Sequence, residues 1–128
     1  MTATIDLVTY SDADLVRSFY YQLVDGTPIN LTGYSLRMMV RKHADDPTAE
    51  FECSTINGRI WFNDAAAGAF TLQIPLAVLS RLTPGTYDQS LIATSPIYSP
   101  NVIPLRKDIW RGSLEHSAGP TRWQAGTQ

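Results

Sequence analysis

The feature that most constrains this chain is the period-two alternation of side chains over residues 19–41. Six apolar residues occupy alternate positions in the two halves of this stretch: Phe19, Tyr21, Leu23, Leu36, Met38 and Val40. Turn-forming residues at 25–28 separate the halves. Period-two alternation bounded by Gly and Pro is typical of β-strands. We therefore expect strands over residues 15–24 and 34–41, with these six side chains in the core.

The same pattern recurs along the chain at intervals of eight to twelve residues, which is typical of β-sandwiches. Further strands are expected at 4–9, 49–53, 59–62, 70–74, 87–93 and 102–116. The last of these is too long to be uninterrupted, so a break or bulge is expected near Pro104 and another at Gly112. One short helical turn is predicted over residues 75–82, where Pro75 suits a first helical position. Asn57-Gly58 predicts a tight hairpin between strands 49–53 and 59–62.

The segment from Leu82 to Tyr87 also contains Gly85, and it resembles the tyrosine corner of immunoglobulin and fibronectin type III domains. In that corner the Tyr hydroxyl bonds to backbone a few residues upstream. The fold expected is all-β: an immunoglobulin-like antiparallel β-sandwich of about 7–9 strands. We assign residues 1–117 to the sandwich and residues 118–128 to a flexible C-terminal tail.

Charge and cysteine content exclude several classes of function. The net charge is −2 and the ten basic residues are scattered, so a nucleic-acid partner is not expected. No segment has the length of a membrane span, and the first residues lack the features of a signal peptide. Cys53 is the only cysteine and is expected to pack in the core, which favours assembly in a reducing cytoplasm.

The chain shows no motif of nucleophilic, phosphate-binding or metal-dependent catalysis. His43 and His116 lie far apart in sequence, and the pair Asp12 and Asp14 lacks the remaining ligands of a calcium loop. We therefore predict no metal site, no cofactor and no enzymatic activity. A small enzyme of unrecognised type is the weakest of three alternatives.

Outward positions are more informative. The alternation turns several large apolar side chains away from the core, and the tail adds another. The candidate interface residues are Tyr20, Met39, Trp61, Trp110 and Trp123. Gathered on one sheet, such residues would form either a protein interface or a platform on which sugars stack.

Three segments in this order resemble a known family: residues 25–34, residues 82–87, and 110–114 with the sequence Trp-Arg-Gly-Ser-Leu. Together they are similar to the immunoglobulin-like amino-terminal domain of phage baseplate upper proteins and to small phage tail-associated proteins. The resemblance covers nearly the whole chain and implies a structural role in a virion or prophage, without catalytic residues. Upper baseplate proteins continue into long fibrous regions, whereas this sequence stops. A separate tail accessory or chaperone-like protein is therefore expected.

The function expected is a non-enzymatic interaction module of a phage or prophage tail or baseplate. Its expected partners are tail or baseplate proteins and further copies of itself in a homo-oligomer. It would reach the virion after assembly in the bacterial cytoplasm. The alternative is a carbohydrate-binding sandwich that uses Trp61 and Tyr20. Aromatic residues in a concave groove near carboxylates would favour sugar, and a flat apolar face or an unpaired edge strand would favour assembly.

Overall fold

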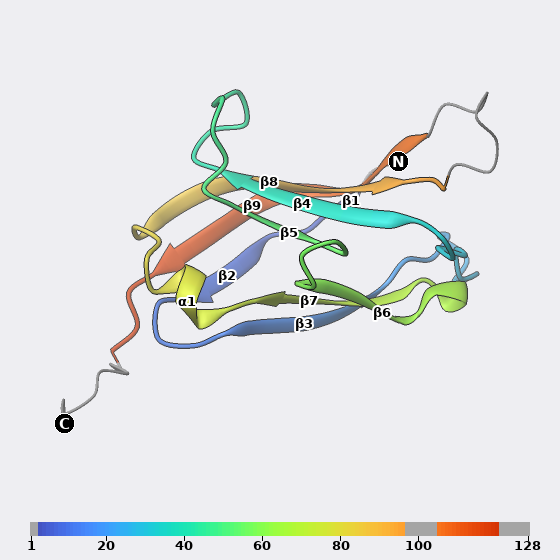
Figure 1. Cartoon of the computed structure of the whole chain (residues 1–128), viewed down its shortest axis with the longest axis horizontal. Coiled ribbons are helices and arrows are strands. Elements are labelled where there is room, and N and C mark those ends of the chain that lie inside the picture. The colour runs from blue at the N-terminus through green and yellow to red at the C-terminus, as the bar shows by residue number, and fades with distance from the viewer. Residues whose placement is uncertain (1–2, 97–104, 121–128) are drawn as a thin grey trace.

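The computed structural model of the chain describes residues 3–96 and 105–120. They form an all-β sandwich of two sheets packed face to face, with the short helix α1 (Leu76–Leu79) at one end (Figure 1). The 3₁₀ turn η1 (Ala65–Ala67) precedes the strand β7 (Ala69–Ile74). The predicted all-β sandwich is confirmed, and the predicted helical turn at 75–82 is confirmed over a shorter length.

The larger sheet has the strand order β1-β9-β8-β4-β5, and β2 also pairs with β9. Its strands are β1 (Ala3–Thr4), β2 (Leu7–Tyr10), β4 (Ser35–Arg41), β5 (Phe51–Ser54), β8 (Gly85–Thr94) and β9 (Arg106–Ser117). β1 and β2 run parallel to β9, so this sheet is mixed rather than purely antiparallel as predicted. The carboxylate of Asp6 accepts hydrogen bonds from the backbone N–H of Ser113 (3.0 Å) and from its hydroxyl (3.2 Å). This side-chain contact lies between β1 and β2, where one continuous strand was predicted.

The smaller sheet is antiparallel, with the order β3 (Leu15–Tyr20), β7, β6 (Ile60–Asp64). β3 ends at Tyr20 instead of residue 24, and Leu23 is 53% exposed, so its predicted place in the core is wrong. The reason is local: Leu23 N–H donates to the Thr27 carbonyl (2.8 Å), and Gln22 bridges to Pro28. Residues 22–28 therefore fold back on themselves, away from the sheet.

Asn57-Gly58 does not form the predicted hairpin, because β5 pairs with β4 in the larger sheet and β6 pairs with β7 in the smaller one. The turn instead carries the chain from one sheet to the other. Gly58 has a φ of +80°, and the Asn57 side-chain oxygen accepts the N–H groups of Ser54 (2.9 Å) and Arg59 (3.1 Å). The turn residues were recognised correctly, but the pairing of the flanking strands was not.

In β9 the irregularity lies at Ile109 and not at Gly112, since Leu91 pairs with Trp110 while the next residue, Ile92, pairs with Asp108. Gly112 has a different purpose. A Cβ there would lie 1.9 Å from the carbonyl oxygen of Ile5, so only glycine lets the residues between β1 and β2 approach β9 this closely. The predicted break at Pro104 lies outside the described residues.

The core lies between the two sheets and contains the inward side chains of the alternating strands. Fully buried examples are Leu36, Met38 and Val40 on β4, with Leu91 and Ala93 on β8. This is the alternation that the sequence predicted for both strands. The Gly119 N–H donates to the Ser11 hydroxyl oxygen (2.9 Å), so the first residues of the predicted tail contact the sandwich. Residues 121–128 lie outside the described part of the chain.

Candidate interaction surfaces

The outward side of the smaller sheet carries two of the predicted interface residues, and we call it the aromatic face. Tyr20 is 69% exposed and Trp61 is 40% exposed. Strand register places Thr71 of β7 opposite both Ser18 of β3 and Trp61 of β6. The two aromatic side chains thus come from strands that flank β7, on one face. This arrangement could not be read from positions 20 and 61 in the sequence.

The polar groups of the aromatic face bond to one another across the sheet. The Thr71 hydroxyl donates to the side-chain oxygen of Asn63 (2.6 Å) and lies 2.9 Å from the Ser18 hydroxyl. Thr71 is itself buried although it points outward. At the centre of this face, the side chains of Ser18, Thr71 and Asn63 are therefore hydrogen-bonded to one another. The side chains exposed around them are Tyr20, Val16 and Trp61.

Trp110 was expected on the surface, and this prediction is wrong. It is 2% exposed, lies opposite inward-facing Leu91, and packs against Phe19 with ring centroids 4.7 Å apart. Its indole N–H donates to the Gln89 side-chain oxygen (2.6 Å), which satisfies the only polar group of the ring. Trp110 is therefore a core residue. Of the remaining candidates, Met39 is half-buried on the outward side of the larger sheet, and Trp123 lies outside the described residues.

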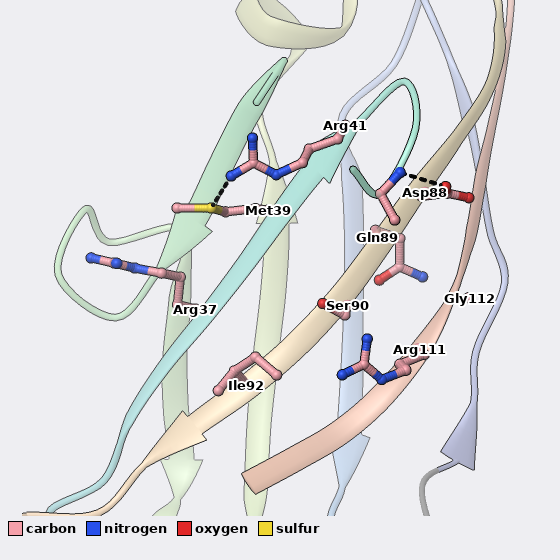
Figure 2. A pocket seen from close by; sticks show the side chains of 10 residues that line it. Arg37, Met39, Arg41, Asp88, Gln89, Ser90, Ile92, Arg111 and Gly112 are labelled. Carbon is pink, nitrogen blue, oxygen red and sulfur yellow. Dashed lines mark hydrogen bonds between the residues drawn. The ribbon is translucent and has the colours of Figure 1, made fainter. Parts of the chain in front are cut away.

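Above Met39 the larger sheet forms a hollow of about 460 Å³, which we call the arginine hollow. Figure 2 shows Arg37, Met39 and Arg41 at alternate positions of β4 on one side and Arg111 of β9 on the other. The loop after β4 contributes Ala44, whose N–H donates to the Asp88 carboxylate (2.8 Å). The hollow is thus lined by charged residues from three strands.

Each of its three arginines already has a partner. Arg37 pairs with Glu52 (2.5 Å), and Arg111 bonds to both carboxylate oxygens of Asp108 (3.0 and 2.9 Å). Arg41 donates to the Asp46 carbonyl (3.0 Å) and to the Met39 sulfur (3.2 Å). Exposed ion pairs of this kind contribute little to stability, about 0–1 kcal/mol each. Two of the three arginines, Arg37 and Arg111, are therefore paired with carboxylates, whereas the partners of Arg41 are uncharged.

The third surface includes an open strand edge. An unpaired edge strand was considered from the sequence, but neither the strand that provides it nor the hollow beside it was predicted. β3 pairs with β7 on one side and has no strand neighbour on its other side among residues 3–96 and 105–120. Beside this edge lies an apolar hollow of about 330 Å³, the seam hollow, which opens between the two sheets. Phe19, Tyr20 and Val24 line it from the β3 side, and Ile5, Ile109 and Trp110 line it from the larger sheet. An open strand edge beside an apolar hollow is a recognised route to strand addition.

The titratable and nucleophilic side chains do not gather into a reactive site. His116 is buried and its Nδ1 lies 2.8 Å from the Thr9 hydroxyl, while His43 is exposed in the loop after β4. Burial raises the pKa of the Cys53 thiol to about 12, so it stays protonated and packs in the core. Within the described residues, no three His, Cys, Asp or Glu side chains come close enough to hold a metal ion.

The residues of the predicted corner do come together. The Tyr87 hydroxyl donates to the carbonyl oxygen of Thr83, and Leu82 packs against the core. Gly85 begins β8, two residues before Tyr87. This is the upstream backbone contact that the sequence predicted.

Comparison with protein-family models finds no match for this chain, and comparison with curated proteins finds none either. In the part of the chain that the structure describes, no helix is both long and apolar enough to cross a membrane.

Proposed function

We propose that this protein is a non-enzymatic structural module of a phage or prophage tail or baseplate, which assembles in the bacterial cytoplasm and remains in the virion. The observation that carries the assembly role is the unpaired β3 edge beside the seam hollow. An edge of this kind offers backbone hydrogen bonds and apolar contact to another chain at once. β5 and β6 are also edge strands, but the seam hollow lies beside β3.

The strand order supports an immunoglobulin-like domain. The smaller sheet, β3-β7-β6, has the neighbours of strands B, E and D, and the run β9-β8-β4-β5 has those of G, F, C and C′. The hydrogen bond between Tyr87 and Thr83 supports the same assignment, because it lies at the start of the strand that corresponds to F.

The positions of the resembling motifs also support the proposal. Residues 25–34 connect β3 to β4 and include the Asx turn in which Asp25 accepts the Thr27 N–H (2.9 Å). The segment 110–114 lies in β9, where Gly112 allows the close approach to Ile5. Each motif thus forms a turn or a close backbone contact that the sandwich needs. The link to phage tails rests on the order of these motifs along the chain.

A carbohydrate-binding function is the second candidate, favoured by the two exposed aromatic side chains on one face. Tyr20 and Trp61 could stack on sugar rings, and Asn63 and Ser18 supply polar groups nearby. The Asn63 and Ser18 side chains already bond to Thr71, however, which leaves them less free to bind a sugar. Binding of oligosaccharides that is lost in Trp61→Ala would favour this candidate over assembly.

The proposed function is tested by deleting the gene in the bacterium that carries it and inducing particle production. We expect particles with incomplete or unstable tails, seen by electron microscopy and by loss of infectivity. The wild-type gene supplied in trans should restore both. Intact infectious particles from the deletion strain, made in normal numbers, would contradict a structural role in the tail.

A further inference from the structure

We propose that two copies of this chain pair antiparallel through their β3 edges about a twofold axis, with Ser18 opposite Ser18 of the second copy. The pairing rests on the proposed role in assembly and adds a specific partner and register to it. The two smaller sheets would then form one continuous sheet across the dimer.

The first step concerns which backbone groups are free. Tyr21 N–H donates to the Gly68 carbonyl (2.8 Å), and this pair continues the register that places Tyr20 opposite Ala69. In an antiparallel pair, successive residues direct their N–H and C=O alternately toward the neighbour and away from it. Residues 15, 17 and 19 therefore face β7. The backbone groups of Val16, Ser18 and Tyr20 face the open edge.

The second step concerns the side chains that such pairing brings together. On the outward face, Val16 of each copy lies opposite Tyr20 of the other, and the two Ser18 side chains lie beside the axis, each with its hydroxyl 2.9 Å from that of Thr71 in its own chain. Aromatic pairs with β-branched residues are among the favourable cross-strand pairs. All three side chains are exposed in the single chain. The edge is thus self-complementary.

On the inward side, Arg17 of each copy lies opposite Phe19 of the other. Within one chain the Arg17 guanidinium carbon already lies 5.1 Å from the centre of the Phe19 ring. Pairing gives each guanidinium a second aromatic neighbour, and it places no like charges opposite each other. Phe19 also lines the seam hollow, so the contact extends apolar packing toward that hollow.

Other antiparallel registers are poorer. Only shifts by two residues keep free backbone groups facing free backbone groups. One such shift places Arg17 opposite Arg17 of the second copy, which is unfavourable for like charges. The opposite shift extends the pairing to Gln22, which lies beyond the end of β3 and already bridges to Pro28. The register centred on Ser18 is therefore selected.

Arg17 also has a contrasting interpretation, since an inward-pointing charge on an edge strand is one device that prevents strand pairing. The two roles predict opposite effects. If Arg17 binds Phe19 of the second copy, Arg17→Ala weakens the dimer. If Arg17 guards the edge, the same substitution produces association where the wild type has none.

Sedimentation velocity over a range of protein concentrations tests the pairing. We expect the wild-type chain to be a dimer. Ser18→Pro removes an N–H that faces the open edge and should abolish the dimer, whereas the matched variant Ser18→Ala should retain it. We also expect Tyr20→Glu to raise the dissociation constant of the dimer by about tenfold, because the twofold axis makes the substitution remove the Val16–Tyr20 pair twice. Trp61→Glu, on the same face, should leave the dissociation constant unchanged. Circular dichroism would verify that each variant is folded.

A wild-type chain that stays monomeric at its highest soluble concentration would overturn the pairing, as would a dimer that persists in folded Ser18→Pro. Neither result depends on the gene-deletion experiment. A monomer that is nonetheless required for intact tails would overturn the β3 dimer and leave the proposed function standing. In that case amide exchange at Val16, Ser18 and Tyr20, slowed only in the particle, would identify a strand of another tail protein as the occupant.

Discussion

The hydroxyl of Tyr87 donates a hydrogen bond to the carbonyl oxygen of Thr83, four residues earlier, and so closes the turn between α1 and β8. Tyr87 is buried, so removal of its hydroxyl leaves that carbonyl without its partner. We expect Tyr87→Phe to lower the free energy of unfolding by about 1–2 kcal/mol, measured by urea denaturation. Tyr10→Phe, at an exposed tyrosine, is the control. An unchanged urea midpoint for Tyr87→Phe would show that the bond contributes nothing.

Gln89 is a buried polar residue whose side chain forms hydrogen bonds on both sides of its amide group. Its side-chain oxygen accepts the Trp110 indole N–H (2.6 Å), and its amide nitrogen donates to the carbonyl of Ile5 (2.7 Å). Gln89→Leu leaves both of those groups unsatisfied, so we expect a loss of about 2–4 kcal/mol in the free energy of unfolding. Ser90→Ala, at the next and outward-facing position, should stay close to wild type. Equal stability of the two variants would contradict this assignment.

Stability should depend on pH through His116. Burial lowers the pKa of this imidazole in the folded chain below its ordinary value of 6.5. The unfolded chain therefore binds the proton more readily, and the stability contributed by neutral His116 is fully present above about pH 6.5 and lost as the pH falls below it. We expect the free energy of unfolding to decrease from pH 7 toward about pH 5. His116→Gln should flatten this slope, whereas His43→Gln, at an exposed histidine, should preserve it.

Cys53 should be chemically silent while the chain is folded. Burial raises the pKa of its thiol to about 12, with a smaller opposing effect from Arg59, and only the thiolate reacts readily. We expect no measurable reaction with a disulfide reagent near pH 8 under native conditions and one equivalent in denaturant. Rapid native labelling would place Cys53 at an accessible position.

Local pattern predicted most strands, because alternation is a property of a few consecutive residues. The strand Ser35–Arg41 and the buried positions of Tyr87, Leu91 and Ala93 were predicted from pattern alone. The errors arose where distant segments decide the outcome. Trp110 is buried because Phe19 and Gln89 receive its ring and its N–H, and no local pattern contains that information.

The same limit applies to the candidate surfaces. That Tyr20 and Trp61 point outward follows from alternation with their inward neighbours. That they share one face depends on the register of β3 and β6 against β7. The edge of β3 is open because no other strand of the described chain pairs there, and that depends on the strand order of both sheets. Sequence therefore predicted exposed residues and could not predict the surface they form.

The most direct test of a role in tail assembly is quantitative mass spectrometry of purified particles from the bacterium that carries this gene. We expect peptides of this chain to co-purify with the tail proteins through a density gradient, at a fixed ratio to them. Recovery of the chain only in the soluble fraction of the lysate, with none in intact particles, would contradict its proposed place in the virion.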